Sequence, residues 1–266
     1  MRYLILGLLG GFLYAAAASP AAPAAPAYPL LQAATSTDAS YNWAGYVAQG
    51  GSYGGVSASW TIPVVAGTAG PAADATWVGI GGVIADDLLQ VGTQAVVDPS
   101  GAVSYQAWLE MMPRASVTLP LTVAPGDLVS ASLTERGAGE WEVSIADATN
   151  GQHYDKMVAY DSSHSSAEWV EEMPSLPHGG LIPLDDFGTV HFTGATAITG
   201  GQSGTLAQTG AQPLLMVSGD GRPLAQTSVL ADDGSFNVTR TVAPAQTAAA
   251  RFRRHEARIE ILILRP

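Results

Sequence analysis

Short runs of alternating apolar and polar residues recur along the chain between residues 41 and 242. Successive side chains of a β-strand point to opposite faces, so such alternation predicts strands with one buried face. Gly, Pro, Asp or Asn separates the runs, as expected for turns. No long stretch shows a helical period of 3.6 residues. The predicted strands cover residues 41–47, 56–62, 76–80, 88–91, 103–110, 117–123, 128–133, 141–145, 152–154, 167–172, 188–192, 214–217 and 236–242.

Many short strands in regular succession predict an all-β fold, either an antiparallel β-sandwich or a barrel. A length of 266 residues allows one large all-β domain or two small ones, and the sequence contains no internal repeat. Cysteine is absent, so no disulfide can support the fold. The hydrophobic core must hold the structure alone, which favours one large domain.

The two ends of the chain differ from this body. Residues 1–19 start with a positive charge, continue with apolar residues and end with small ones, which predicts a cleaved signal peptide and a secreted protein. A membrane anchor is the alternative, but the apolar run is short for a spanning helix. Residues 20–39 are rich in Ala and Pro and read as a linker or pro-segment. The predicted domain covers residues 40–243, and residues 244–266 form a basic extension.

The charge of the chain excludes one class of partner. Asp and Glu number 23 against 11 Lys and Arg, which gives a net charge of −12 and argues against nucleic-acid binding. Five of the basic residues lie in residues 251–266. A body with so few bases gains little positive charge when its carboxylates are protonated, which is consistent with tolerance of acid. An ordinary acidic surface is the alternative explanation.

Several kinds of catalytic or binding site find no support in the sequence. A serine hydrolase of the elbow type needs a strand–turn–helix context, and residues 200–204 have the composition of that motif without the context. The histidines lack the spacing of metal ligands, and no phosphate-binding loop is present. We therefore expect no metal and no cofactor.

Carboxylates remain as the candidates for chemistry. Residues 167–174 form an acidic strand that ends near a proline, in which Glu168 and Glu172 share one face while Trp169 and Glu171 share the other. Trp169 marks the face that packs inward, so Glu168 and Glu172 are free to line a groove. On the strand at 103–110, Gln106, Trp108 and Glu110 share a face that fits either a groove or a solvated surface.

A family resemblance adds to this reading. In order along the chain, residues 42–45, 56–63, 77–80, 89–92, 105–113, 167–172 and 186–192 resemble segments of the glutamic peptidases, also called eqolisins. The resemblance covers roughly residues 40 to 242 and includes the bacterial members of that family. It implies a β-sandwich of two long antiparallel sheets, similar to a concanavalin-like jelly roll. It also implies acid endopeptidase activity from a Glu/Gln dyad.

The resemblance assigns roles to particular residues. It places the catalytic glutamine at Gln90 and the catalytic glutamate at Glu172, whereas Glu171 lies on the other face of its strand. The residues expected to line or brace the substrate cleft are Trp43, Trp77, Trp108 and Glu110. The sequence departs from the family at Gly81, where an Asp is usual, and this puts the substrate preference or pH optimum in question.

The residue types fit peptide hydrolysis without a metal. Glu172 can take a proton from water and pass it to the leaving amine, while the amide of Gln90 stabilises the oxyanion. A carboxylate with an ordinary pKa matches an acidic working range. The alternatives are a carbohydrate-binding module, a glycosidase that uses Glu110 with Glu172, and an inactive relative. We expect protein or peptide substrates, no membrane association after signal cleavage, and a monomer.

Overall fold

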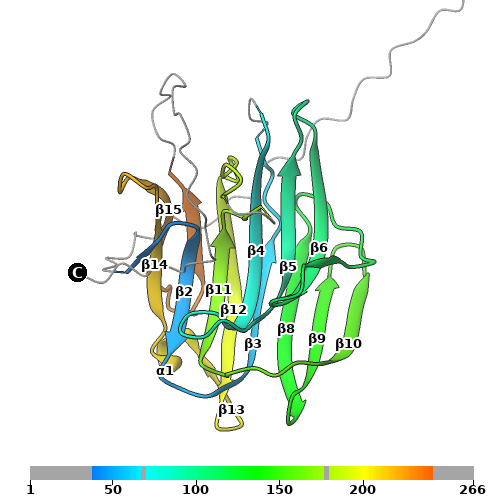
Figure 1. Cartoon of the computed structure of the whole chain (residues 1–266), viewed down its shortest axis with the longest axis vertical. Coiled ribbons are helices and arrows are strands. Elements are labelled where there is room, and N and C mark those ends of the chain that lie inside the picture. Colours follow the sequence, from blue (N-terminus) through cyan, green and yellow to red (C-terminus); the bar gives the residue numbers. More distant parts are fainter. Residues whose placement is uncertain (1–37, 67–69, 177–179, 242–266) are drawn as a thin grey trace, which may run out of the picture.

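The structure is a computed structural model that describes residues 38–66, 70–176 and 180–241. This part of the chain is nearly all β, as predicted, with long strands running side by side (Figure 1). The strands form two layers, which we name the site sheet and the back sheet. The site sheet contains, in spatial order, β2 (Trp43–Gln49), β11 (Ser166–Glu172), β4 (Ala72–Gly81), β5 (Leu88–Val97), β6 (Val103–Met111) and β7 (Val117–Thr118).

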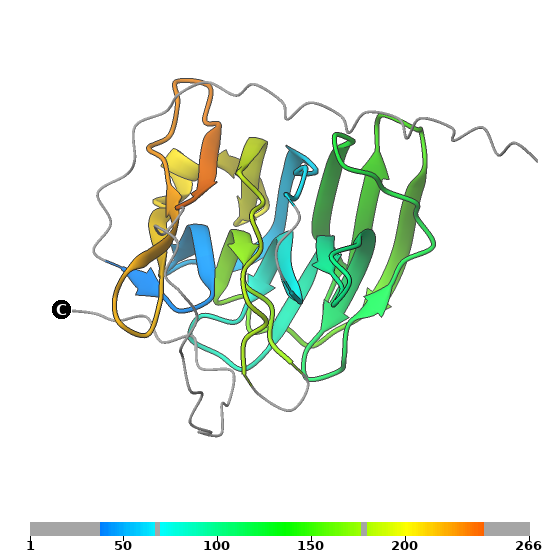
Figure 2. The same cartoon turned by 90° about the horizontal axis from the view of Figure 1, so that it is seen from above.

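The back sheet lies against the site sheet, and the two layers are visible from above in Figure 2. Its strands, in spatial order, are β10 (His153–Ala159), β9 (Glu140–Asp147), β8 (Leu128–Gly137), β3 (Tyr53–Thr61), β12 (Thr189–Thr199), β16 (Phe236–Arg240) and β15 (Pro223–Thr227). The strand β14 (Gln212–Val217) joins the layers, because its first half pairs with β2 and its second half with β15. The predicted antiparallel β-sandwich is therefore confirmed.

Three short elements complete the described chain. The strand β1 (Ala39–Ser40) pairs with β14 in parallel, and β13 (Gln202–Thr205) pairs with β12. The single-turn helix α1 (Leu206–Thr209) starts at a capping box, in which Thr205 and Gln208 bond each other's backbone N–H groups. These elements are too short to give a periodic pattern, and the sequence did not predict them.

The core fills the space between the two layers. Trp60, Trp141, Trp169 and Phe192 are fully buried there, and the rings of Phe192 and Phe236 stack with centroids 4.7 Å apart. The indole of Trp169 on the site sheet donates a hydrogen bond of 2.9 Å to the carbonyl of Ser57 on the back sheet. The prediction that Trp169 faces inward is therefore confirmed.

The alternating stretch at residues 117–123 was predicted as a strand, but only its first two residues form β7. Leu119, Leu121 and Val123 are still buried, so the alternation in this segment reflects burial and not strand pairing. Pro120 has no N–H to donate, which interrupts the ladder. Several other strands are longer than predicted. The strands β5 and β12 exceed their predicted lengths by the most.

The predicted signal peptide and the basic extension lie outside the described residues. Among the residues that are described, no helix is long and apolar enough to cross a membrane.

Candidate active site

The outer face of the site sheet carries a second apolar cluster, separate from the core between the layers. We name it the tryptophan face, and it consists of Trp43, Trp77, Trp108, Val47, Ala75, Leu88, Val170 and Leu214. The rings of Trp43 and Trp77 meet edge to face with centroids 4.9 Å apart. The three tryptophans are at most 5% exposed, so in this structure they brace the face more than they line an open surface.

Gln90 and Glu110 form a hydrogen-bonded pair on this face. They lie opposite each other on β5 and β6, and the Gln90 Nε2 atom donates to Glu110 Oε2 at 2.6 Å. Their neighbours in sequence, such as Leu89 and Val91, point into the core. Burial raises the pKa of Glu110, and the hydrogen bond from Gln90 opposes that rise. The Oε1 atom of Gln90 is buried and has no hydrogen-bond donor among the described residues.

Glu172 ends β11 on the same face. The indole N–H of Trp77 donates to its Oε2 atom at 2.8 Å, and the amide of Asn42 donates to its Oε1 atom at 3.3 Å. Burial raises the pKa of Glu172 to about 7, the bond from Trp77 opposes this, and the charge of Glu110 adds to it. A carboxylate with an ordinary acidic pKa was expected here, and the pKa of Glu172 is higher because packing removes much of its carboxyl from water.

Asn42 was not among the residues expected in the site. Its side-chain oxygen accepts a hydrogen bond of 3.1 Å from the hydroxyl of Ser40, which turns the amide nitrogen towards Glu172. The hydroxyl of Ser40 also accepts from the backbone N–H of Trp43 at 3.1 Å. The only signal available in the sequence was that Asn42 opens one of the segments that resemble the glutamic peptidases.

Trp77 connects the two halves of the site. Its indole nitrogen bonds Glu172, while its six-membered ring lies against Gly79, which pairs with Gln90 on β5. A Cβ atom on Gly79 would come within 2.7 Å of that ring. Gly92 likewise allows β5 to approach, since a Cβ atom there would lie 2.5 Å from the Cβ atom of Trp77. Gly79 therefore leaves the space that the indole occupies, and Gly92 lets β5 lie close to the backbone of β4 at Thr76 and Trp77.

Glu171 points the other way, as the alternation predicted, and joins a cluster inside the sandwich. The hydroxyl of Thr76 donates to its Oε2 atom at 2.6 Å, and Asp74 and Asp185 lie beside it. We name Asp74, Glu171 and Asp185 the carboxyl cluster; each is at most 1% exposed. Burial raises the pKa of Glu171 to about 8 and that of Asp185 to about 10, and it raises the pKa of Asp74 well above its usual value.

Two further carboxylates differ from expectation. Glu168 shares the outer face but is fully buried, so the prediction that it is free to line a groove is wrong. Burial also raises its pKa well above the usual value. At Gly81, where the family Asp is missing, the Asp87 Oδ2 atom lies 2.8 Å from the position that a Cβ atom would take. Asp87 is held there by the backbone N–H of Ser163 at 2.7 Å, so a carboxylate is present at this end of β4.

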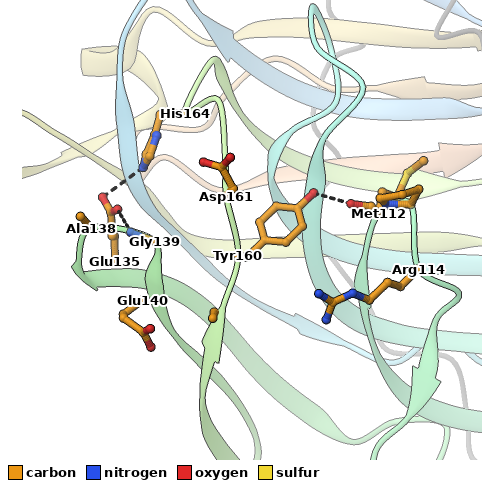
Figure 3. Close-up of a pocket in the computed structure, with 11 residues that line it drawn as sticks. Met112, Arg114, Glu135, Ala138, Gly139, Glu140, Tyr160, Asp161 and His164 are labelled. Carbon is orange, nitrogen blue, oxygen red and sulfur yellow. Dashed lines mark hydrogen bonds and ion pairs between the residues drawn. The ribbon is translucent and has the colours of Figure 1, made fainter.

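A cavity of about 790 Å³ lies beside the end of β6 that follows Glu110, next to Met112 and Pro113 (Figure 3). None of the six residues predicted for the site lines it. Two of its lining side chains already pair with each other, since the Nε2 atom of His164 lies 3.0 Å from the Oε2 atom of Glu135. Met112 and Tyr160 form the wall nearest to the site. Within the described ranges, no group of three His, Asp or Glu residues is arranged to hold a metal ion.

Comparisons with known proteins show which family this chain resembles. The model of the peptidase A4 family matches residues 41–240. Aspergillopepsin-2 of Aspergillus niger is 29% identical over 228 residues, which cover 76% of this chain and 79% of the relative. Scytalidopepsin B of Scytalidium lignicola is 29% identical over 177 residues, which cover 62% of this chain and 66% of the relative.

Solved structures show the same fold. Scytalido-glutamic peptidase with a transition state analog inhibitor superposes with a TM-score of 0.65 at 24% identity, covering 77% of this chain and all of that one. Aspergilloglutamic peptidase from Aspergillus niger superposes with a TM-score of 0.57 at 27% identity, covering 64% of this chain and 99% of that one.

Proposed function

The chain belongs to the peptidase A4 family and is a glutamic endopeptidase, and from this premise we propose that Glu172 and Gln90 are its catalytic dyad. In this proposal Glu172 is the general base that activates water. Gln90 stabilises the negative charge that develops on the carbonyl oxygen of the scissile peptide bond. The reaction needs no metal ion, and the substrates are proteins or peptides.

The surroundings of Glu172 suit a general base. It is partly exposed, so water and substrate can reach it. Trp77 and Asn42 each donate to a different carboxyl oxygen, which fixes the plane of the group without neutralising it. A pKa of about 7 makes the ionised form a stronger base than an ordinary carboxylate.

The surroundings of Gln90 suit an oxyanion donor. One N–H of its amide is taken by Glu110, which fixes the orientation of the group. The amide nitrogen has a second N–H that can donate to a developing oxyanion. The buried Oε1 atom has no donor among the described residues, and a nucleophilic water could supply one. Glutamine itself does not titrate, so its amide keeps both N–H donors across the pH range.

The proposed reaction proceeds in two proton transfers. Water attacks the carbonyl carbon as Glu172 takes one of its protons, and the carbonyl oxygen becomes an oxyanion bonded to Gln90. The tetrahedral intermediate then collapses, the C–N bond breaks, and Glu172 returns the proton to the leaving amine. The products are a carboxylic acid and an amine, and Glu172 is ionised again.

We place the working range just below neutral pH, because a reaction that needs ionised Glu172 loses rate as the pH falls below about 7 and the fold loses stability as the pH rises. The carboxyl cluster is more stable protonated than ionised, so the fold loses stability as the pH rises. Secretion fits this range, and it rests on the signal peptide predicted for residues 1–19. We also propose that the mature protein is a monomer without membrane association.

The observation that carries the proposal is the placement of Glu172 and Gln90 on one face of one sheet, with Trp77 touching Glu172 and the residue beside Gln90. The test is cleavage of denatured casein by the wild-type protein and by Glu172→Gln and Gln90→Ala. We expect losses of about 10³-fold in kcat for the first and about 10²-fold for the second. Circular dichroism would confirm that both variants fold.

Gln226→Ala is the control, since Gln226 is an exposed glutamine on β15 of the back sheet, away from Gln90 and Glu172. It should retain activity. Full casein cleavage by Glu172→Gln or Gln90→Ala would refute the dyad. Incubation with polysaccharides tests the carbohydrate alternatives, which the hydrogen bond between Gln90 and Glu110 does not favour, because a glycosidase has no use for that amide.

A further inference from the structure

The side chain of Tyr160 extends from the end of β10 in the back sheet to β5 and β6 in the site sheet. It directly follows β10, and its backbone N–H donates to the carbonyl of Gly139 at 2.9 Å. Its own carbonyl accepts from the indole of Trp141 at 3.2 Å. The backbone of Tyr160 is therefore fixed to the hairpin of β8 and β9, while its side chain reaches across to the site sheet (Figure 3).

The hydroxyl of Tyr160 enters the ladder between β5 and β6. The pair that follows Leu89 and Met111 is Leu88 opposite Met112, and an ordinary antiparallel pair would exchange two direct hydrogen bonds. Only one is direct, from Met112 N to Leu88 O at 2.9 Å. In place of the second, the Tyr160 hydroxyl accepts from Leu88 N at 2.7 Å and donates to Met112 O at 2.9 Å.

The inserted hydroxyl lies close to the proposed oxyanion donor. Leu88 is two residues before Gln90, and Met112 is two residues after Glu110, so the modified pair is the next hydrogen-bonded pair along the ladder. The side chains of Leu88 and Met112 also pack in the tryptophan face. A hydroxyl between two strands holds their backbones further apart than a direct bond would. The separation of β5 and β6 at the Gln90–Glu110 pair therefore depends on Tyr160.

We propose that Tyr160 is a positioning residue for the reaction: its hydroxyl sets the spacing of β5 and β6 and thereby the geometry of the hydrogen bond from Gln90 to Glu110. This inference rests on the proposed function of Gln90. Tyr160 acts through the backbone of the two strands and does not touch the substrate. The hydroxyl keeps its proton in any acidic or neutral assay, because burial raises the pKa of Tyr160 to about 12.

The test compares Tyr160→Phe with Tyr46→Phe in the full chain. Tyr46 is a matched control, because its hydroxyl also bonds the backbone, at 2.9 Å to Ser228 O, but its side chain lies in the core between the layers. With a peptide substrate, we expect Tyr160→Phe to lose about tenfold or more in kcat, as a small misplacement of a catalytic group does. KM should stay within about threefold, because substrate contacts are unchanged.

A second readout does not depend on catalysis. The side-chain amide signals of Gln90 can be assigned by NMR from their absence in Gln90→Ala, and their pH dependence reports the ionisation of Glu110. The bond from Gln90 lowers the pKa of Glu110. A loosened bond in Tyr160→Phe should therefore shift the Gln90 signals and raise the pH midpoint of their titration, while Tyr46→Phe leaves both unchanged.

The possible outcomes separate this inference from the proposed function. An unchanged kcat or an unchanged Gln90 titration in Tyr160→Phe would overturn the positioning role. Equal losses in Tyr46→Phe, or a Tyr160→Phe variant that does not fold, would show a purely structural role and overturn it as well. Failure of the wild-type protein to cleave any peptide would refute the proposed function, while the Gln90 signals would still show whether Tyr160 positions the pair.

Discussion

Glu171 and Glu172 are neighbours in β11, yet they belong to two different acidic regions of the molecule. Glu172 lies on the outer face with Gln90 and Glu110, partly exposed and held by donors from Trp77 and Asn42. Glu171 lies in the carboxyl cluster, completely buried. Both have a raised pKa, about 7 for Glu172 and about 8 for Glu171, and burial is the main cause in each.

The difference shows that a raised pKa alone does not identify a catalytic group. The outer carboxyl can meet water and an amide donor, so its proton can be transferred to a substrate. The inner carboxyls contact one another, Thr76 and the backbone of Ala95, with the charged groups Arg240 and Asp186 at the edge of the cluster. Their protonation affects the stability of the fold. One strand thus places a catalytic candidate on one face and a pH-sensitive group on the other.

The largest effect that would test this comparison is on stability. The pKa of Glu171 is about 8 in the folded protein and has its ordinary value when unfolded. Its stabilising contribution is therefore complete at low pH and is lost as the pH rises towards 8. Glu171→Gln should remove that loss, which is on the order of 3 kcal/mol in the free energy of unfolding between pH 5 and 8.

Urea unfolding at pH 5, 6.5 and 8 measures this difference. Glu140→Gln changes an exposed carboxylate at the start of β9 and serves as the control. Asp185 still titrates in the Glu171→Gln variant, so a smaller decline with pH should remain. Parallel pH dependences for the wild type and Glu171→Gln would contradict the structural role of Glu171. Peptidase activity at pH 5 should survive this substitution within about threefold, since Glu171 lies on the face away from the substrate.

The next effect concerns the pH dependence of catalysis on the outer face. A base must be ionised, and the pKa of Glu172 is about 7. We expect kcat/KM to fall about tenfold for each pH unit below that value. Glu110→Gln removes a charge that raises the pKa of Glu172, so the midpoint of the profile should move to lower pH even if the overall rate falls.

Initial rates with a peptide substrate from pH 3 to 8 measure the profile. A rate that stays level or increases towards pH 4 would show that the protonated form of Glu172 is the competent one. In that case Glu172 would act first as an acid towards the carbonyl oxygen. The pH midpoint of the rate profile of Glu110→Gln then decides whether the carboxyls of Glu110 and Glu172 interact as the structure indicates.

The smallest effect concerns Trp77, which links the halves of the outer face. Gly79→Ala would place a methyl group within 2.7 Å of the indole ring and displace it. We expect kcat to fall about tenfold and stability to fall by about 1 kcal/mol, as in other overpacked sites. Gly54→Ala is the control, because a Cβ atom there meets only the Glu135 side chain at 4.0 Å. Equal activities of the two variants would show that the position of Trp77 does not matter for Glu172.

Much of the fold followed from alternation, and the failures have identifiable causes. The pattern predicted most of the long strands and placed Glu171 and Glu172 on opposite faces. The pattern predicted a strand longer than β7, because apolar residues can alternate in a buried segment without pairing with a neighbouring strand. It also suggested that Glu168 is accessible, because alternation gives the face of a residue and says nothing of what covers it.

The sequence by itself determined the class of the fold, the face on which each strand residue lies, and, through its resemblance to glutamic peptidases, the candidates Gln90 and Glu172. These depend on local geometry and on the order of the residues. Only the tertiary structure decided which side chains meet: Trp77 and Asn42 at Glu172, Glu110 at Gln90, and Tyr160 in the ladder beside them. Strand register and sheet packing bring Asn42 to Glu172 across 130 positions of the sequence. Burial in that packed structure, and not residue type, raises the pKa of Glu172 to about 7.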